Sequence, residues 1–333
     1  MEKTIEVREA SQVAEVRRVA AELARAEKLS DDESGRLALI ATEAATNLVK
    51  YGKAGTVTLT RYTLGAQHGV QLIAVDGGPG FADFAGAARD GHSTSGSLGI
   101  GLGVIMRSAT FFDVYSVRDQ GTALLARVAH NAPRKGFAAS DFESAARTCP
   151  KKGQVECGDA WSVRDFGKRQ LICVADGLGH GPLAALASGR AISVLEQASQ
   201  DDTPVQIVTR MHEQLRDTRG AVVAVLALDS VAGTADFCGV GNIAAAIYQA
   251  GESRHLLSVE GIVGYRMREA RLQQVAWDSN AVAILYSDGV SGRWGLARYP
   301  GLLKRDPALV ASVLFRDHAK DTDDATIVVA RRN

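Results

Sequence analysis

Two sets of polar motifs follow each other along this chain of 333 residues, and together they limit the folds that it can adopt. In the first half, Glu43 and Asn47 lie on a helical segment ahead of two glycine-rich segments, Asp76-Gly77-Gly78-Pro79-Gly80 and Gly99-Ile100-Gly101-Leu102-Gly103. The second half has four separated acidic sites, which are Asp159, Asp176, Asp288 and the pair Asp323-Asp324. The first set suits a nucleotide and the second suits divalent metal ions, so we expect two different domains in series.

Length and composition agree with two globular domains. A chain of 333 residues exceeds the usual size of one domain. Its 38 basic and 38 acidic residues cancel, so no charge excess indicates a nucleic-acid surface. The four cysteines are too far apart for a Cys-x-x-Cys motif, and we expect reduced thiols. With no apolar signal region and no stretch long enough to span a bilayer, we expect a cytoplasmic protein without nucleic-acid or membrane partners.

The elements expected in the first half are typical of a two-layer α+β sandwich. Ser11 is expected to cap a first helix, and Ser30 with Glu33 forms a capping-box pattern at the start of a second. The apolar face of the second helix should pack on a sheet. A further helix is expected from Val104, and strands are expected at residues 56–62, 69–76, 110–117 and 122–128.

Glu43 and Asn47 share a polar face of the second helix, because they are four residues apart. That spacing alone most often marks an exposed helix surface, but the segments downstream favour a site. Asp76 ends an expected strand and can accept a hydrogen bond from an exocyclic amine, while the glycines after it let the backbone approach a flat base. The glycine run at 99–103 leads into a helix, whose first backbone amides can hold phosphates.

The motif order E-x-x-x-N, D-x-G-x-G, G-x-G-x-G and Gly121-Thr122 resembles that of GHKL ATP-binding domains. Within that group, residues 1–129 resemble the RsbT-like serine/threonine kinases of the anti-sigma type. The resemblance implies that Asn47 binds the Mg²⁺ that bridges the ATP phosphates, and that Glu43 activates the acceptor hydroxyl or orients water. It also implies that Asp76 recognises adenine, with support from Thr122. The glycines implied to form the pocket and its lid are Gly78, Gly80, Gly99, Gly101 and Gly103.

Residues 130–136 (HNAPRKG) combine a proline, two basic residues and a glycine, and we interpret them as a linker. Beyond them, residues 137–333 are expected to form a β-rich domain of two sheets covered by helices. Helices are expected to start at Pro182 and, after a Thr203 cap, at Pro204. Strands are expected at residues 140–148, 158–165, 170–175, 220–228, 234–239, 244–248, 281–287 and 326–330.

Each acidic site of the second half borders an expected apolar strand. Asp176 and Asp288 each follow one, Asp159 opens one, and Asp323-Asp324 precede the last. Any one of these residues alone would most often be a solvated turn residue, but four such sites favour a common function. Hard divalent cations need oxygen ligands, so carboxylates that converge from several segments can hold two of them.

Motifs at these sites resemble those of the PP2C-like phosphatases of the SpoIIE and RsbX type, in the same order: ECGDAW, VADGLGHG, GVGN, LYSDGV and DDAT. The resemblance implies two Mn²⁺ or Mg²⁺ ions that activate a water for attack on phosphoserine or phosphothreonine. It implies that Asp176 bridges both ions, with the Gly177 carbonyl on one, and that Asp159 acts directly or through water. Asp288 and Asp323 would complete the other site, with Asp324 as the alternative to Asp323.

The two resemblances together predict an α+β protein, with a GHKL two-layer sandwich followed by a PP2C-like αββα sandwich. They imply a metal-dependent serine/threonine phosphatase with an ATP-binding, kinase-like domain. The implied partners are STAS-domain proteins, the anti-anti-sigma and stressosome components of bacterial stress and sigma-factor partner switching. The alternative is that the first domain is a non-transferring ATP sensor, or a docking module that sequesters a STAS or sigma regulator. A homodimer is compatible with either.

Overall fold

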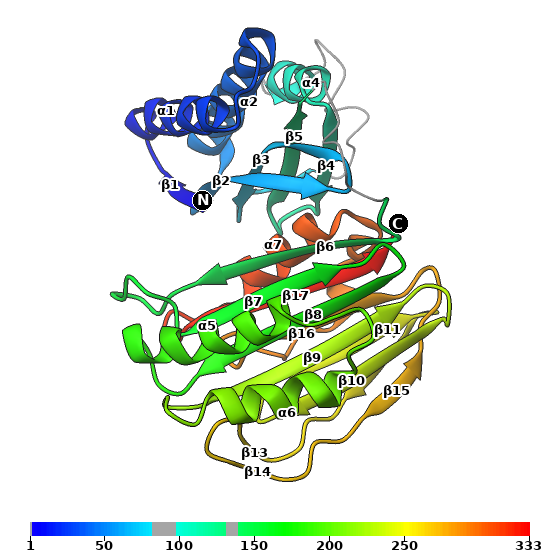
Figure 1. Cartoon of the computed structure of the whole chain (residues 1–333). Helices are drawn as coiled ribbons and strands as arrows, with labels where there is room; N and C mark the ends of the chain where they lie inside the picture. The colour runs from blue at the N-terminus through cyan, green and yellow to red at the C-terminus, as the bar shows by residue number, and fades with distance from the viewer. Residues whose placement is uncertain (1, 82–97, 131–138) are drawn as a thin grey trace. The chain divides into compact units, whose positions relative to one another are not determined.

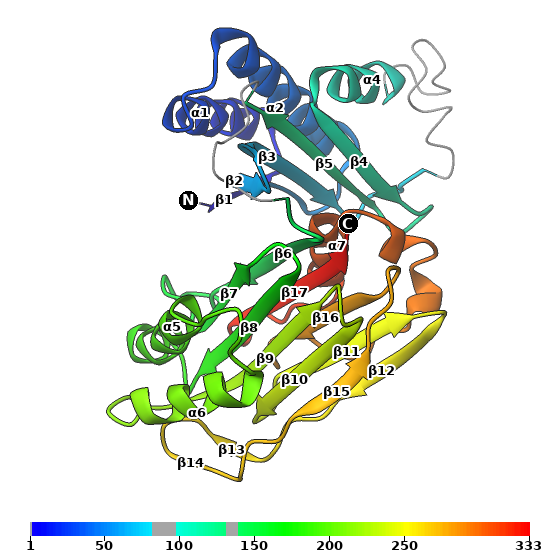
Figure 2. The same ribbon diagram turned by 45° about the vertical axis from the view of Figure 1, so that its right-hand side comes forward.

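The computed structural model describes residues 2–81, 98–130 and 139–333. The chain forms two compact units, one from residues 1–137 and 299–313 and the other from residues 138–298 and 314–333. Figures 1 and 2 show the elements of each unit from two sides. Except for His130, the expected linker at residues 130–136 lies outside the described residues, as does the expected lid segment at residues 91–96.

The first unit contains one antiparallel five-stranded sheet in the order β1-β2-β3-β5-β4. Its strands are β1 (Glu2–Val7), β2 (Gly55–Leu64), β3 (Gln67–Asp76), β4 (Phe111–Ser116) and β5 (Thr122–Ala129). Its helices before the linker are α1 (Ala10–Ala26), α2 (Asp31–Tyr51) and α4 (Leu98–Ser108). These three helices lie on one face of the sheet (Figure 2), which confirms the expected two-layer sandwich.

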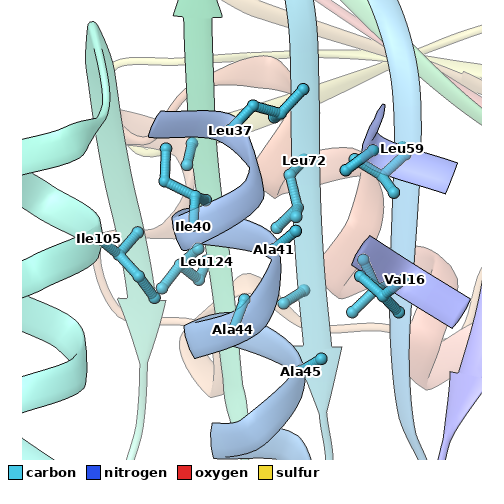
Figure 3. Packing of buried hydrophobic residues seen from close by; sticks show 14 of the residues in the cluster. Val16, Leu37, Ile40, Ala41, Ala44, Ala45, Leu59, Leu72, Ile105 and Leu124 are labelled. Atoms are coloured by element: carbon cyan, nitrogen blue, oxygen red, sulfur yellow. The ribbon is translucent and has the colours of Figure 1, made fainter. Parts of the chain in front are cut away.

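The core of this sandwich lies between α2 and the sheet. Leu37, Ile40, Ala41 and Ala44 recur at helical spacing along α2 and are all buried. Figure 3 shows this face packed against Leu72 and Leu124 of the sheet, between Val16 of α1 and Ile105 of α4. The apolar face therefore fixes the rotation of α2, and Glu43 and Asn47 lie half-buried beside it.

The predicted N-terminal cap is confirmed for α2 but not for α1. Ser30 caps α2, since its Oγ accepts a hydrogen bond from the Glu33 backbone N at 3.3 Å and Glu33 Oε2 accepts one from the Ser30 backbone N at 2.8 Å. Helix α1 instead begins at Ala10, after Glu9, whose backbone N donates to Gln12 Oε1 at 2.7 Å. Ser11 therefore lies inside the helix, and the expectation that it caps α1 was wrong.

Helix α4 also begins earlier than the sequence indicated, at Leu98 rather than at Val104. Leu102 and Ile105 of this helix are buried in the core that α2 forms with the sheet. The run at 99–103 therefore lies within a helix and is not the loop before one. Strand β1 was not anticipated; it pairs along β2 from Glu2 with Thr60 to Val7 with Gly55.

Residues 299–313 join the first unit through a buried ion pair. The Arg127 guanidinium on β5 donates to both carboxylate oxygens of Asp306, at 2.8 and 3.1 Å, and its Nε donates to Gln71 Oε1 at 2.9 Å. The Asp306 backbone N donates to Asp113 Oδ2 at 2.9 Å. Arg127 and Asp306 are only 9% and 3% exposed, so this bidentate pair is desolvated and geometrically specific.

The second unit is a sandwich of two antiparallel five-stranded sheets, in the orders β15-β10-β9-β8-β7 and β12-β11-β16-β17-β6. The strands of the first are β7 (Asp159–Asp165), β8 (Arg169–Gly177), β9 (Ala221–Asp229), β10 (Thr234–Val240) and β15 (Gln273–Ala276). Those of the second are β6 (Phe142–Cys149), β11 (Ala244–Gln249), β12 (Glu252–Leu256), β16 (Val282–Tyr286) and β17 (Ala325–Arg332). The short strands β13 (Gly261–Ile262) and β14 (Arg266–Met267) form a separate pair.

Two apolar layers hold this unit together. Ile172 and Leu226 of one sheet and Leu285 and Val328 of the other belong to the cluster between the sheets. A second cluster joins the outer face of β8 and β9 to the helices α5 (Pro182–Glu196) and α6 (Pro204–Gln214). As expected, Thr203 caps α6, because Thr203 Oγ1 accepts a hydrogen bond from the Gln206 backbone N at 3.3 Å.

Several elements after β11 are not among the strands and helices assigned from the sequence. They are β12, β13, β14 and β15, the 3₁₀ turns η1 (Leu296–Arg298) and η2 (Leu302–Lys304), and helix α7 (Pro307–His318). Helices within the described ranges are all too short or too polar to cross a bilayer.

Candidate nucleotide pocket and carboxylate site

A cavity of about 80 Å³ lies in the first unit beside the expected nucleotide residues. Its lining residues are Ala44, Asn47, Leu48, Tyr51, Ala74, Asp76, Pro79, Gly80, Phe81, Leu102, Thr122 and Leu124. The structure thus brings Asn47 of α2 to one cavity with Asp76 and Thr122 of the sheet. An apolar wall with a few polar groups is typical of small-molecule sites.

Asp76 and Thr122 are direct partners in the ladder between β3 and β5. Asp76 Oδ1 accepts a hydrogen bond from the Gly78 backbone N at 2.6 Å, which holds the carboxylate against the turn. Thr122 Oγ1 lies 3.0 Å from Ser116 Oγ, which also accepts a hydrogen bond from the Phe81 backbone N at 2.8 Å. Ser116 was missed in the sequence, yet it ties Thr122 to the chain that follows Asp76.

Two of the expected glycines are needed because backbone atoms approach them closely. A Cβ on Gly78 would lie 2.5 Å from the Tyr51 carbonyl oxygen. Gly80 has φ +59°, and a Cβ there would overlap the Val117 carbonyl oxygen. Only glycine fits both positions without moving the backbone. The turn after Asp76 therefore closes tightly over one end of the cavity.

Glu43 and Asn47 face Gly101 of α4. A Cβ on Gly101 would lie 2.8 Å from Glu43 Oε2 and 3.3 Å from Asn47 Oδ1. The two polar side chains can therefore lie between α2 and α4 only because residue 101 has no side chain. Gly99 and Gly103 lie in the same helix.

In the second unit, strand ends bring the acidic residues together. Asp159 at the start of β7 pairs directly with Asp176 near the end of β8, and such partners have Cα atoms about 4.5–5.5 Å apart. Asp324 contacts the glycines next to two other acidic residues, Asp159 and Asp288. A Cβ on Gly158 would lie 2.6 Å from Asp324 Oδ2, and one on Gly289 would overlap the Asp324 carbonyl oxygen. Residues far apart in the sequence thus form one carboxylate cluster.

Buried hydroxyl groups support Asp159, which is 5% exposed. Ser287 Oγ donates to Asp159 Oδ2 at 2.6 Å and accepts a hydrogen bond from the Thr326 backbone N at 2.9 Å. Thr326 Oγ1 lies 2.7 Å from Thr148 Oγ1. None of these three hydroxyl residues was assigned from the sequence. Only the place of Ser287 within the S-D-G motif could have indicated its role.

Asp288 is exposed, and two residues that the sequence analysis did not assign contact it. Asn242 Nδ2 donates to Asp288 Oδ2 at 2.8 Å, and the Lys320 ammonium donates to the Asp288 carbonyl oxygen. Asn242 ends the GVGN motif, which was the available signal for it. Nothing in the sequence marked Lys320. A few residues after Lys320, Asp323 Oδ1 accepts a hydrogen bond from the Asp324 backbone N at 3.0 Å.

Two carboxylates of the cluster, Asp159 and Asp176, have raised pKa values. Burial is the main cause for Asp159, whose pKa rises to about 7; the hydrogen bond from Ser287 opposes this shift and the charge of Asp324 adds to it. Burial, followed by the charges of Asp159 and Asp288, raises the pKa of Asp176 to about 8. Full ionisation of the cluster at neutral pH is therefore unfavourable unless positive charge is added.

Two oxygens of the cluster, Asp159 Oδ1 and Asp324 Oδ2, are buried without a hydrogen-bond partner. Buried polar atoms are costly unless a partner satisfies them. A divalent cation with oxygen ligands would satisfy such atoms and offset the repulsion among the carboxylates, so this donor set fits Mg²⁺ or Mn²⁺. As they stand, no three His, Cys, Asp or Glu side chains of the described residues form a group that could hold a metal ion, so cation binding would have to draw these carboxylates closer together.

Known family models match both halves of the chain. Residues 6–128 match the histidine kinase-like ATPase domain, and residues 167–333 match Stage II sporulation protein E (SpoIIE). The chain belongs to the SpoIIE family. Its SpoIIE-type half contains most of the carboxylate cluster, and its ATPase-like half contains the cavity with Asn47 and Asp76.

Two relatives from Bacillus subtilis (strain 168) each match one half of this SpoIIE-family chain. The phosphoserine phosphatase RsbX is 25% identical over 142 residues, or 42% of this chain and 71% of RsbX. The serine/threonine-protein kinase RsbT is 33% identical over 94 residues, or 28% of this chain and 71% of RsbT. The SpoIIE-family chain is therefore a PP2C-type phosphatase fused to a kinase-like ATPase domain, within the partner-switching family, as the sequence predicted.

Solved structures show the same architecture for the phosphatase half. A chain from work on the bacterial stressosome, "a modular system that has been adapted to control secondary messenger signaling", aligns with a TM-score of 0.53 and 30% identity, covering 57% of this chain and 99% of that one. RsbX in complex with magnesium aligns with a TM-score of 0.51 and 21% identity, covering 58% of this chain and 96% of that one. The expected PP2C-like sandwich is thereby confirmed.

Proposed function

We propose that the second unit removes phosphate from phosphoserine or phosphothreonine in a reaction that depends on two divalent cations. The main support is the pair of buried oxygens, Asp159 Oδ1 and Asp324 Oδ2, which lack hydrogen-bond partners within a cluster of carboxylates. In a folded protein such atoms usually indicate a missing partner. The raised pKa of Asp176, caused by its burial and by neighbouring carboxylates, points to a positively charged partner.

The ligand roles that we propose are those implied by the family resemblance, and the neighbours of each residue support them. Asp176 lies among the other carboxylates and would bridge the two ions, with the Gly177 carbonyl beside it. Asp159, held by Ser287, would act directly or through water, and Asp288 and Asp323 would complete the second site. We keep Asp323 as the ligand, as the motif order implies, with Asp324 as the alternative, because Asp324 Oδ2 is one of the two buried oxygens without a partner. Bound Mn²⁺ or Mg²⁺ would lower the pKa of a water and direct it at phosphorus.

The substrates that we propose are phosphorylated STAS-domain proteins of a stress or sigma-factor pathway. This proposal is supported by the identity shared with RsbX, a phosphoserine phosphatase, and by the likeness to a chain from the bacterial stressosome. The test is the Asp176→Asn variant with a serine-phosphorylated STAS-domain protein. We expect no phosphate release, while ATP binding by the first unit is unchanged. Phosphate release at the wild-type rate would refute the metal assignment.

For the first unit, we propose binding of ATP with Mg²⁺ and transfer of its terminal phosphate. Asn47 would hold the Mg²⁺, Glu43 would receive the proton of the acceptor hydroxyl, and Asp76 with Thr122 would bind adenine. The close approach of Gly101 to Glu43 and Asn47, together with 33% identity to the kinase RsbT, supports this proposal.

A Glu43→Gln variant distinguishes this kinase from an ATP sensor or docking module. If the first unit transfers phosphate, this substitution abolishes labelling of a STAS-domain protein by γ-labelled ATP but preserves ATP binding. Native mass spectrometry of the wild-type chain with the same protein provides the second readout. A stable complex without any transfer would favour the docking module.

A further inference from the structure

Three large apolar side chains lie exposed beside the carboxylate cluster. Val155 is 95% exposed, and Leu183 and Leu186 of α5 are each 52% exposed. The other face of α5 supplies the buried residues that pack on the sheet, so the core does not account for these leucines. Exposed apolar residues that gather around a functional site often mark the place where a partner binds.

The loop that carries Val155 is attached to the cluster at one end and to α5 at the other. The Lys151 backbone N donates to Asp324 Oδ1 at 2.8 Å, and the Gln154 backbone N donates to the Lys151 carbonyl oxygen at 2.9 Å. A Cβ on Gly181, the residue before α5, would lie 3.2 Å from Gln154 Oε1. Val155 is therefore adjacent in sequence to a residue that meets the start of α5.

The first turn of α5 lies directly over the cluster. A Cβ on Gly177 would overlap the Ala184 carbonyl oxygen, and one on Gly158 would lie 3.0 Å from Ala184 Cβ. Gly158 and Gly177 are the neighbours in sequence of Asp159 and Asp176. Leu183 precedes Ala184, and Leu186 follows on the same helical face at a spacing of three. Leu183 therefore adjoins the residue that meets the turns of Asp159 and Asp176, and Leu186 lies about one turn further along the same face of α5.

Charge on the same loop suits a phosphorylated partner. Lys151 and Lys152 form no ion pair with any described residue, and Lys152 is exposed. A phosphoserine carries about −1.5 to −2 charges at neutral pH, so two cations beside the cluster would attract it. The loop and α5 thus present positive charge and apolar side chains together.

We propose that Val155, Leu183 and Leu186, here named the apolar ledge, bind apolar side chains next to the phosphorylated residue of a protein substrate. The inference rests on the proposed phosphatase function and adds to it a surface for substrate choice. Because the ledge contacts the protein part of the substrate and not the phosphate, it distinguishes phosphoproteins from small phosphate esters.

The test compares two substrates with a Leu183→Ser, Leu186→Ser double variant and with a Val155→Ser variant. The substrates are a serine-phosphorylated STAS-domain protein and p-nitrophenyl phosphate, both with Mn²⁺. We expect kcat/KM for the phosphoprotein to fall about tenfold or more in the double variant, mainly through KM, with no change for p-nitrophenyl phosphate. Val231→Ser is the matched control, because Val231 is 73% exposed in a turn of the same unit.

Unchanged kcat/KM for the phosphoprotein in both variants would contradict the proposed role of the apolar ledge. An equal loss of kcat/KM for both substrates would also contradict it. The failure of the proposed function has a different signature, in which the wild-type chain hydrolyses neither substrate. In that case the affinity for the phosphoprotein, measured by titration calorimetry, decides the matter. Binding about tenfold weaker in the double variant than in Val231→Ser supports the ledge, and equal binding overturns it.

Discussion

Ser287 Oγ donates a 2.6 Å hydrogen bond to Asp159 Oδ2, and both residues are almost fully buried. This bond fixes one carboxylate oxygen and leaves Oδ1 directed elsewhere without a partner. Groups that orient a ligand carboxylate typically change metal affinity or activity by about 10–100-fold when removed. Ser287 therefore acts as a positioning residue for Asp159.

The Ser287→Ala variant is expected to need about tenfold more Mn²⁺ for half-maximal phosphate release. Ser230→Ala is the matched control, because Ser230 Oγ makes an equally short bond to Asp141 Oδ2 in the same unit. The control should keep the wild-type Mn²⁺ requirement. If both variants respond alike, the bond at Asp159 has only a structural role.

The raised pKa values of Asp159 and Asp176 predict how stability depends on pH in the metal-free protein. Both carboxyls titrate at about 7 and 8 when folded but near 3.8 when unfolded, so the folded state holds more protons between about pH 4 and pH 8. Stability therefore falls as pH rises through that window. We expect the Tm of the metal-free chain to decrease from pH 5 to pH 8.5, and added Mn²⁺ to restore it.

Removal of one charge should reverse part of this loss. Asp176→Asn is expected to raise the Tm of the metal-free chain at pH 8.5 by a few degrees, at about 2–4 °C per kcal/mol for a domain of this size. Asp201→Asn, at an exposed site away from the cluster, is the control and should leave the Tm unchanged. A Tm for Asp176→Asn below that of the wild type at pH 8.5 would contradict the argument from repulsion.

Gly101 offers a test of the first unit that leaves the second intact. A Gly101→Ala substitution places a methyl group 2.8 Å from Glu43 Oε2, which forces Glu43 or α4 to move. We expect ATP affinity to fall about tenfold or more while phosphate release by the second unit is unchanged. Gly35→Ala in α2 is the control, since a Cβ there meets nothing within 4 Å. If Gly101→Ala binds ATP with wild-type affinity, the close approach of Gly101 to Glu43 is not needed for nucleotide binding.

The ion pair between Arg127 and Asp306 predicts a strong effect on stability. Asp306→Ala leaves the Arg127 guanidinium buried without a counter-charge, and such losses typically cost about 3–5 kcal/mol. Arg18→Ala breaks an exposed pair with Glu22 and should leave the Tm close to that of the wild type. Thermal unfolding of the two variants checks the difference. Equal Tm values would show that the buried pair contributes little.

Much of the carboxylate site was predictable because its residues occupy strand ends. Asp176 and Asp288 each follow an apolar strand, and a glycine after each marks the turn. The fold of both halves also followed from periodicity and motif order, as the confirmed cap at Ser30 illustrates. Local sequence carried this information because each of these features depends on neighbours along the chain.

The parts that were missed depend on contacts between distant segments. Ser287 reaches Asp159 across 128 positions, and Asn242 reaches Asp288 across 46 positions, next to the pairing of β11 with β16. The start of α4 at Leu98 was missed because glycines usually weaken helices, whereas here Gly101 allows close packing against Glu43. Tertiary packing determined these features, and hydrophobic periodicity does not encode them.

Above all, we propose that the second unit is a metal-dependent phosphoprotein phosphatase. The most direct measurement is phosphate release from a serine-phosphorylated STAS-domain protein by the wild-type chain, first with Mn²⁺ and then after chelation. We predict release that requires Mn²⁺, stops on chelation and resumes when Mn²⁺ is restored. Release that persists after chelation, or no release under either condition, would contradict the account.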